Sequence, residues 1–422
     1  MARDNEWRKK ELSVDEVIAK YPEIPPIVIL KMDIHRRGLT YTEAALAKLD
    51  PNIHQVNQGN SCFFGNKDYI PECLSLRDGS DILAIFDFDK DAQRDPYVVD
   101  VVDDKIVITD NGKVYEEVWY WEKPDYYDKL ASNGVPLQKY LHARPQRLDV
   151  AGSSYCYFWD TPGHGCKYCT FTPNYLKNAK ENGVSEKRKG YPDIKYVEEA
   201  FKEAIKQPGR YSSIMYGGGS ILSGPELLDD EVDFTIEMIQ MTQKYFDAKK
   251  IPSTLVATAY NDRQMEKLYE QTALMTYTTD VEVLNKELFE WICPGKAAKI
   301  GYDEWKRRLY HAVDVFGRGN VTSGVVLGVE LAKPNGFKDE EEAFRNVVEE
   351  AEEIISHGVA LAANVWRASP GSIFQHQDTP SLEYYVRVYR EFDRLHHKYE
   401  VGRFTDDYRR CGAHPGLDLL RI

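Results

Sequence analysis

Short apolar runs alternate with amphipathic helices from residue 148 onward. Each apolar run has the length of a buried strand, and the polar segment after it shows the 3.6-residue period of a helix packed on one face. Six consecutive units of this kind, each about 40 residues long, predict a parallel sheet with right-handed crossovers. The predicted strands span residues 148–157, 213–216, 254–259, 274–281, 321–329 and 360–366.

The helix predicted over residues 340–357 illustrates the pattern. Its apolar positions, including Ala343, Val347, Ala351 and Ile354, line one face, and Gly358 ends it. The sequence alone does not decide whether the sheet is open or curled into a barrel. In either case ligands bind beyond the carboxyl ends of the strands.

The first 147 residues follow a different pattern. Ser13 to Glu16 and Thr40 to Glu43 have the spacing of capping boxes, which predicts two early helices. A period of two then predicts strands over residues 82–88, 97–102, 105–109 and 114–121. Tight turns at Asp103-Asp104 and Asp110 to Gly112 would join these strands into an antiparallel meander. We therefore expect an α+β accessory domain over residues 1–147, an α/β domain over 148–400 and a tail over 401–422.

Composition and charge narrow the class of protein. The chain of 422 residues is 42% hydrophobic and 29% charged, as in globular proteins. No apolar run approaches the roughly 18 residues of a spanning helix, and the charged start lacks the apolar core of a signal peptide, which predicts a cytoplasmic protein. The net charge of −14 argues against nucleic acid as a partner, although Lys187 to Lys189 form a short basic run.

The cysteines are unevenly distributed. Three of the seven, Cys156, Cys166 and Cys169, lie within fourteen residues directly after the first predicted strand. Clustered cysteines in a cytosolic protein indicate metal binding or redox chemistry. His164 could complete a Cys3His zinc site in a binding protein. Three cysteines alone suit a four-iron cluster whose fourth iron is left open for a small ligand.

These residues resemble the motif of radical S-adenosylmethionine (SAM) enzymes. In that superfamily three cysteines after the first strand hold a [4Fe-4S] cluster, and an aromatic residue precedes the last cysteine, as Tyr168 does here. The common spacing is Cys-x3-Cys-x2-Cys, whereas nine residues separate Cys156 from Cys166. A nine-residue gap is known in the elongator-type tRNA-modifying branch, which makes a tRNA-modifying enzyme the alternative.

Later segments resemble the family's SAM-binding segments in the expected order. The glycine run after strand two is similar to the segment that meets the SAM amino group, with Ser220 where the family often has an acid. Polar residues after strand four are similar to those that meet the ribose or carboxylate, and strands five and six carry the adenine segments. The SAM-binding residues implied are Tyr168, Gly217, Gly218, Gly219, Ser220, Glu282, Asn285, Gly328, Glu330, Asn364 and Arg367.

The resemblance implies a partial (βα)6 barrel of the TIM type and two cofactors, a [4Fe-4S] cluster on Cys156, Cys166 and Cys169, and SAM. It also implies reductive cleavage of SAM to a 5′-deoxyadenosyl radical, hydrogen abstraction from a small-molecule substrate, and an electron donor such as flavodoxin or ferredoxin. No membrane partner is expected.

The tail holds further reactive residues. Cys411 is a candidate hydrogen donor, covalent site or extra ligand, and Arg409 or Arg410 could bind an anionic substrate. We expect Cys62 and Cys73 to lie in a polar loop as isolated thiols, and together with Cys411 they are a candidate auxiliary cluster. In the segment after strand four, we expect Cys293 to be buried rather than reactive.

Overall fold

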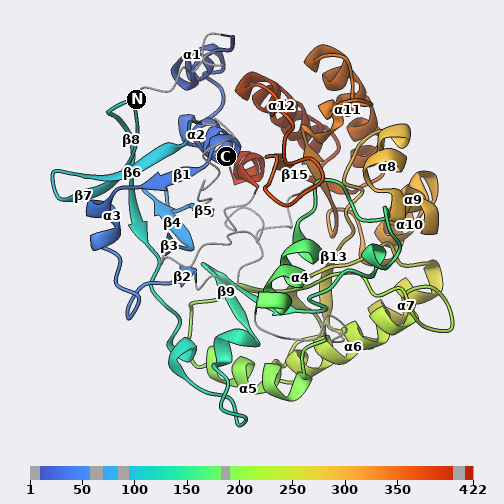
Figure 1. Cartoon of the computed structure of the whole chain (residues 1–422). Helices are drawn as coiled ribbons and strands as arrows, with labels where there is room; N and C mark the ends of the chain where they lie inside the picture. The colour runs from blue at the N-terminus through green and yellow to red at the C-terminus, as the bar shows by residue number, and fades with distance from the viewer. Residues whose placement is uncertain (1–9, 58–69, 84–94, 182–190, 403–413, 422) are drawn as a thin grey trace.

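The computed structural model describes residues 10–57, 70–83, 95–181, 191–402 and 414–421. Two sheets organise the chain, one in each half (Figure 1). The N-terminal sheet has the strand order β1-β6-β7-β8-β4-β5, and β2 and β3 form a separate pair. Its strands are β1 (Leu39–Tyr41), β4 (Cys73–Leu76), β5 (Asp81–Leu83), β6 (Tyr97–Val102), β7 (Lys105–Asp110) and β8 (Lys113–Tyr120), with β2 (Val56–Asn57) and β3 (Ile70–Pro71) beside them.

The antiparallel pairing of β6, β7 and β8 confirms the predicted meander. Asp103, Asp104 and Asn111 have positive φ angles of 49°, 65° and 50°, as the tight hairpin turns between these strands require. The first helix, α1 (Val14–Lys20), begins with the expected capping box of Ser13 and Glu16.

Two expectations for this half are wrong. Thr40 lies within β1 because this segment pairs with β6, and Thr42 instead caps α3 (Glu43–Ala47). Cys73 does not lie in a loop but is buried in β4. Cys62 lies outside the described residues, so the auxiliary cluster proposed for it with Cys73 and Cys411 stays untested.

The second sheet has the order β15-β14-β13-β12-β11-β10-β9. Strands β10 to β15 pair in parallel in chain order, and only β9 (His142–Arg144) is antiparallel, beside β10. Each of the six predicted apolar runs overlaps one strand, and β12 begins three residues before its predicted run of 254–259. The parallel strands are β10 (Arg147–Ala151), β11 (Ser213–Gly217), β12 (Ile251–Val256), β13 (Leu274–Thr278), β14 (Val321–Leu327) and β15 (Ala360–Val365).

Helices cover the outer side of this curled sheet (Figure 1). Their buried faces join one core with the strands, as α11 shows with Ala343, Val347 and Ala351. The α/β class with a curled sheet agrees with the prediction. The helices are α4 (Phe171–Glu181), α5 (Ile194–Ala204), α6 (Asp229–Gln243), α7 (Asp262–Gln271), α8 (Lys286–Ile292), α9 (Pro294–Lys299), α10 (Tyr302–Phe316), α11 (Glu340–Ser356) and α12 (Leu382–Lys398).

Helix α2 (Pro26–Arg37) joins the two halves. It packs against α12 and against the 3-10 helix Pro415–Arg421 near the C-terminus. Lys31 and Asp418 form an ion pair of 2.6 Å there, with both side chains buried. Leu417 packs on Ala362 of β15, so the end of the chain contacts the sheet. Among the described residues, no helix combines the length and the apolar character needed to cross a membrane.

Candidate metal and cofactor site

The three clustered cysteines follow the carboxyl end of β10. This strand ends at Ala151, six residues earlier than predicted. The chain leaves the sheet because the Ser153 hydroxyl donates to the carbonyl of Tyr155 (2.7 Å) and accepts from its amide (3.2 Å), which closes a tight turn. Cys156 comes next, before the 3-10 helix Tyr157–Asp160.

The glycine run after β11 holds the Cys156 end of the loop. The amide of Gly219 donates to the carbonyl of Ser153 (2.7 Å), and the amide of Tyr157 donates to the carbonyl of Ser220 (2.9 Å). A Cβ on Gly219 would lie 2.4 to 2.6 Å from the backbone of Tyr155 and Cys156. Glycine is therefore required here because two backbone segments touch.

The segment after β13 holds the other end of the loop. Lys167 donates its amide to the carbonyl of Ile292 (2.9 Å), and Gly295 donates its amide to the carbonyl of His164 (3.0 Å). A Cβ on Gly295 would lie 2.5 Å from the His164 oxygen. The cysteine loop is thus fixed by backbone contacts at both ends, and its tip, residues 161–163, is exposed.

The three half-buried thiols lie close enough to influence one another's charge. Burial raises the pKa of Cys156, and hydrogen bonds from the Phe158 amide and from the amide and hydroxyl of Ser220 oppose this effect. Burial also raises the pKa of Cys169. The pKa of Cys166 is lowered, chiefly because the thiol of Cys293 donates a hydrogen bond to it.

Sequence reasoning identified Cys293 as buried, which is confirmed at 0% exposure, but missed its contact with Cys166. It also missed Lys296, whose ammonium lies 2.6 Å from Glu282 Oε1 and donates to the carbonyl of Asp280 (2.9 Å). Lys296 further lies over the ring of Trp305. The Pro-Gly dipeptide after Cys293 was a signal that another backbone segment could pack closely there. The ion pair of Lys296 could not be predicted, because its partner Glu282 lies fourteen residues earlier in the chain.

Glu282 has a φ of 69°, which is rare for a residue other than glycine. The backbone is fixed there by bonds to the β14 residues Gly324 and Val326. Burial, then the nearby charge of Glu282, raises the pKa of Asp280 to about 6. Tyr168 belongs to the same group, since its hydroxyl interacts with Cys166 and the charge of Glu282 contributes to raising its pKa after burial.

The other predicted SAM-binding residues lie at three further places. Asn285 caps α8, accepting from the amide of Leu288 (3.0 Å). Glu330 is buried and accepts the Gly328 amide (2.9 Å) and the hydroxyl of Tyr384 from α12. Asn364 lies in β15 on the face shared with Val326, and Arg367 follows that strand. Cys411, Arg409 and Arg410 lie outside the described residues.

Among the described residues, no three histidine, cysteine or acidic side chains converge on a single-ion geometry. The zinc alternative needs Cys156, His164, Cys166 and Cys169 around one ion, and these side chains are not arranged in that way. A four-iron cluster is wider than one ion, because each thiolate binds a different iron.

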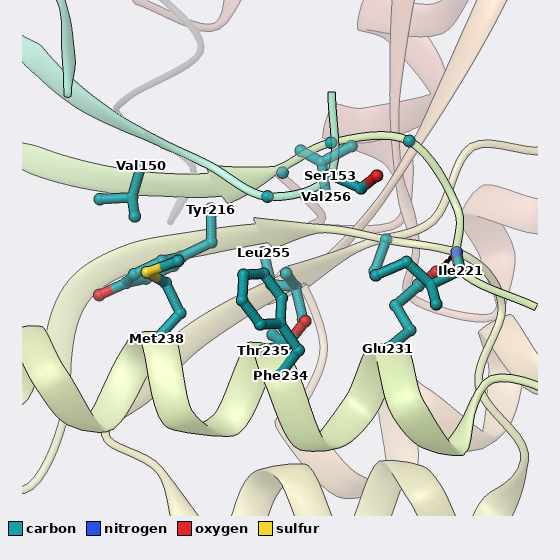
Figure 2. Close-up of a pocket in the computed structure, with 15 residues that line it drawn as sticks. Val150, Ser153, Tyr216, Ile221, Glu231, Phe234, Thr235, Met238, Leu255 and Val256 are labelled. Atoms are coloured by element: carbon teal, nitrogen blue, oxygen red, sulfur yellow. Dashed lines mark hydrogen bonds between the residues drawn. The ribbon is translucent and has the colours of Figure 1, made fainter. Parts of the chain in front are cut away.

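A small cavity lies beneath the glycine run, between β10, β11, β12 and α6 (Figure 2). Its volume of about 30 Å³ is enough for a water or two and too small for SAM. Glu231 rises into it from α6 toward Ile221 (Figure 2).

No family model matches the chain. Bacteriochlorophyllide c C-7(1)-hydroxylase of Chlorobaculum limnaeum is 24% identical over 385 residues, covering 88% of this chain and 87% of that protein. The crystal structure of methylornithine synthase (PylB) is 12% identical with a TM-score of 0.41, covering 66% of this chain and 73% of that one. A radical SAM methyltransferase from Sphaerobacter thermophilus is 14% identical with a TM-score of 0.39, covering 71% and 73%.

The cysteine motif follows the first of six parallel strands, and the glycine run of the second strand touches it backbone to backbone. The cysteine motif after the first strand and the glycine run after the second are the two segments in which the sequence resembles the radical SAM superfamily. In these features the chain resembles radical SAM enzymes.

Proposed function

We propose that this protein binds a [4Fe-4S] cluster through Cys156, Cys166 and Cys169 and uses SAM to abstract hydrogen from a small-molecule substrate. The observation that supports this most is the double attachment of the cysteine loop. Glycines of the second strand hold one end and the segment around Gly295 holds the other. Such an attachment keeps three thiols together at the carboxyl ends of the strands, where parallel sheets bind ligands.

The residues present fit the cluster. All three ligands are soft sulfur donors, and each receives hydrogen bonds of the kind that stabilise a thiolate. Phe171, for example, donates its amide to Cys169 Sγ (3.4 Å). No fourth cysteine is needed as a ligand, since the buried thiol of Cys293 is engaged with Cys166.

Cys156, Cys166 and Cys169 would hold the cluster, which would supply the electron for reductive cleavage of SAM. The chain's own residues bind and orient the cofactors and the substrate, and they exclude water from the site. In this proposal SAM contacts backbone groups of Gly217, Gly218 and Gly219, while the missing Cβ atoms of Gly218 and Gly219 leave room for the cysteine loop. Glu282 with Lys296 places a buried pair of opposite charges near Cys166. The six parallel strands form the partial (βα)6 barrel, and residues 1–147 form an accessory domain beside it.

An electron donor such as flavodoxin or ferredoxin completes the proposal. The exposed tip of the cysteine loop, residues 161–163, brings the site near the surface. An open groove of about 770 Å³ adjoins it, with Tyr157, Asp160 and Lys299 in its wall.

The test is anaerobic reconstitution followed by incubation with SAM and a strong reductant. We expect a brown protein with about four irons per chain that releases 5′-deoxyadenosine, and a Cys166→Ala variant that does neither. Cys73→Ala, in the other sheet, separates this site from the candidate auxiliary cluster, because loss of iron in that variant would indicate a second cluster. A colourless protein holding one zinc would contradict the proposal. The tRNA-modifying alternative would be supported only by retention of tRNA at low salt.

A second candidate is hydroxylation of a C–H bond. It is favoured by the match to the bacteriochlorophyllide c hydroxylase, which spans 88% of this chain and thus both of its halves. Incubation of the reconstituted enzyme with SAM, reductant and bacteriochlorophyllide c tests it by mass spectrometry of the pigment. An unchanged pigment, under conditions in which 5′-deoxyadenosine is formed, would rule out this substrate and leave the first proposal intact.

A further inference from the structure

Among the described strands, β15 has a neighbour on one side only and so forms an edge of the second sheet. Such an edge exposes backbone groups that could pair with a further strand. Side chains of α12 occupy two of these groups. The amide of Leu361 donates to His396 Nε2 (3.0 Å), and the carbonyl of Ala363 accepts the hydroxyl of Tyr389 (2.5 Å). The described sheet therefore ends at β15, and other elements close its edge.

The 3-10 helix near the C-terminus fills the space beside this edge, between β15 and α2 (Figure 1). It fits so closely against α12 that a Cβ on Gly416 would lie 1.6 Å from a ring carbon of Tyr389. On its other side, Asp418 forms the buried ion pair of 2.6 Å with Lys31 of α2. The C-terminal 3-10 helix thus joins the edge of the barrel sheet to the N-terminal half.

Leu417 of this helix reaches the inner face of β15. Successive side chains of a strand point to opposite faces. Leu361 and Ala363 belong to the core that the strands share with the outer helices. Ala362, which lies between them, instead packs with Leu417 in a separate cluster, where Leu417 is 5% exposed. A side chain from the C-terminus therefore covers part of the face that the outer helices do not cover.

The contact between Leu417 and Ala362 lies beside residues of the candidate site. Ala362 is the register partner of Gly324 in β14, so the two positions share a face. On that face Asp280 covers Gly324, because its Oδ1 accepts the Gly324 amide (2.7 Å) and would lie 2.5 Å from an added Cβ. Asn364, a predicted SAM-binding residue, shares the face two positions after Ala362. The helix thus borders the part of the inner face where we propose that SAM binds.

We propose that the C-terminal 3-10 helix is a wall of the reaction cavity, in which Leu417 acts as a positioning residue for SAM. The inference rests on the proposed function, since it needs SAM at the carboxyl ends of the strands. The helix is anchored on both sides, by Gly416 against α12 and by Asp418 against α2. A wall that is fixed before the ligand arrives reduces the entropy lost on binding, so SAM should bind more tightly than it would beside a loose edge.

The test is the dissociation constant of SAM for the reconstituted full-length protein, measured anaerobically by equilibrium dialysis without substrate. We expect Leu417→Ala to raise this constant about threefold to tenfold, because the wall loses its contact with Ala362. The iron content should stay at the wild-type value. Gly416→Ala should weaken SAM binding at least as much, since the added Cβ overlaps the Tyr389 ring and displaces the helix. The double variant Leu417→Ala/Ala362→Leu restores the lost volume and should recover most of the affinity.

Leu395→Ala is the matched control. Leu395 is a fully buried leucine of α12 in the core between the helices and the sheet. Its replacement should lower the melting temperature and leave the affinity for SAM unchanged.

Equal SAM affinities of Leu417→Ala, Gly416→Ala and the wild type would overturn the proposed wall. An equal loss of affinity in Leu395→Ala would overturn it as well, because the effect would then be one of general stability. Loss of iron from Leu417→Ala would also count against it, since the helix would then serve cluster assembly. A wild-type protein that takes up no cluster or binds no SAM would instead refute the proposed function.

Discussion

Replacement of Gly219 by alanine tests the attachment of the cysteine loop. The added Cβ would lie 2.4 Å from the Tyr155 carbonyl oxygen and 2.6 Å from the Cys156 amide nitrogen. Ordinary contact begins at 3.4 Å, so the loop must retreat by about 1 Å. Two hydrogen bonds, Gly219 to Ser153 (2.7 Å) and Tyr157 to Ser220 (2.9 Å), would then stretch beyond bonding distance.

The cost follows from these contacts. Overpacking costs about 1 to 3 kcal/mol, and each lost hydrogen bond about 0.5 to 1.5 kcal/mol, which together give about 2 to 6 kcal/mol. The strain is local, so we expect the fold to persist while iron binding falls by at least tenfold. The assay is iron content per chain after anaerobic reconstitution, with circular dichroism as the check on folding.

Gly217→Ala is the internal control for this prediction. Its Cβ would meet Val256 at 3.4 Å, an ordinary contact, although it belongs to the same glycine run. We expect Gly217→Ala to retain the wild-type iron content. Equal iron content in the two variants would refute the reasoning, because the close approach at Gly219 would then have no effect on the loop.

Three further predictions concern buried charges. Lys296→Met should lower the free energy of unfolding by about 3 to 5 kcal/mol in urea titrations, because it leaves Glu282 buried without its partner, and adding Glu282→Gln should recover part of the loss. Burial raises the pKa of Glu330 from 4.5 to about 7, so the folded state holds a proton that the unfolded state releases, and stability falls as pH rises between these values. Glu330→Gln should therefore flatten a fall of about 3 kcal/mol between pH 4.5 and 7, and an unchanged slope would contradict this. Lys31→Met should loosen the C-terminal segment, because it removes the buried ion pair of 2.6 Å with Asp418. We expect cleavage there at least tenfold faster in limited proteolysis, whereas Lys20→Met, at a more exposed pair, should leave the rate unchanged.

Local patterns in the sequence were sufficient for the strands and the cysteine motif. An apolar run or a Cys-x2-Cys pair is contained in a few neighbouring residues, so each parallel strand and the site after the first one could be predicted. The burial of charged residues in helix α2 could not be predicted from a local pattern. Its Asp33, Arg36 and Arg37 are buried because their partners, such as Asp110 and Glu11, come from distant segments.

The same limit applies to the site. The sequence shows three cysteines and a glycine run, but not that the two are in backbone contact. It also does not show that Cys293 and Lys296, more than a hundred residues later, lie beside Cys166. These contacts depend on strand order in the sheet, which places the ends of β10, β11 and β13 at one edge. A local motif therefore predicts the candidate ligands, and the topology determines what surrounds them.

Ser220 shows how the two levels combine. The family often has an acid at this position, and its absence left the role of Ser220 open. The structure contains a buried carboxylate nearby, but it comes from Glu231 on α6 and accepts backbone amides of the turn. Because Glu231 already binds the backbone of this turn, a charged side chain at position 220 is not required to stabilise it. The Ser220 hydroxyl instead lies 2.7 Å from the hydroxyl of Thr258, which in turn lies 3.3 Å from Glu231 Oε2. Ser220 therefore belongs to a hydrogen-bond network in which Glu231 supports the turn after the glycine run.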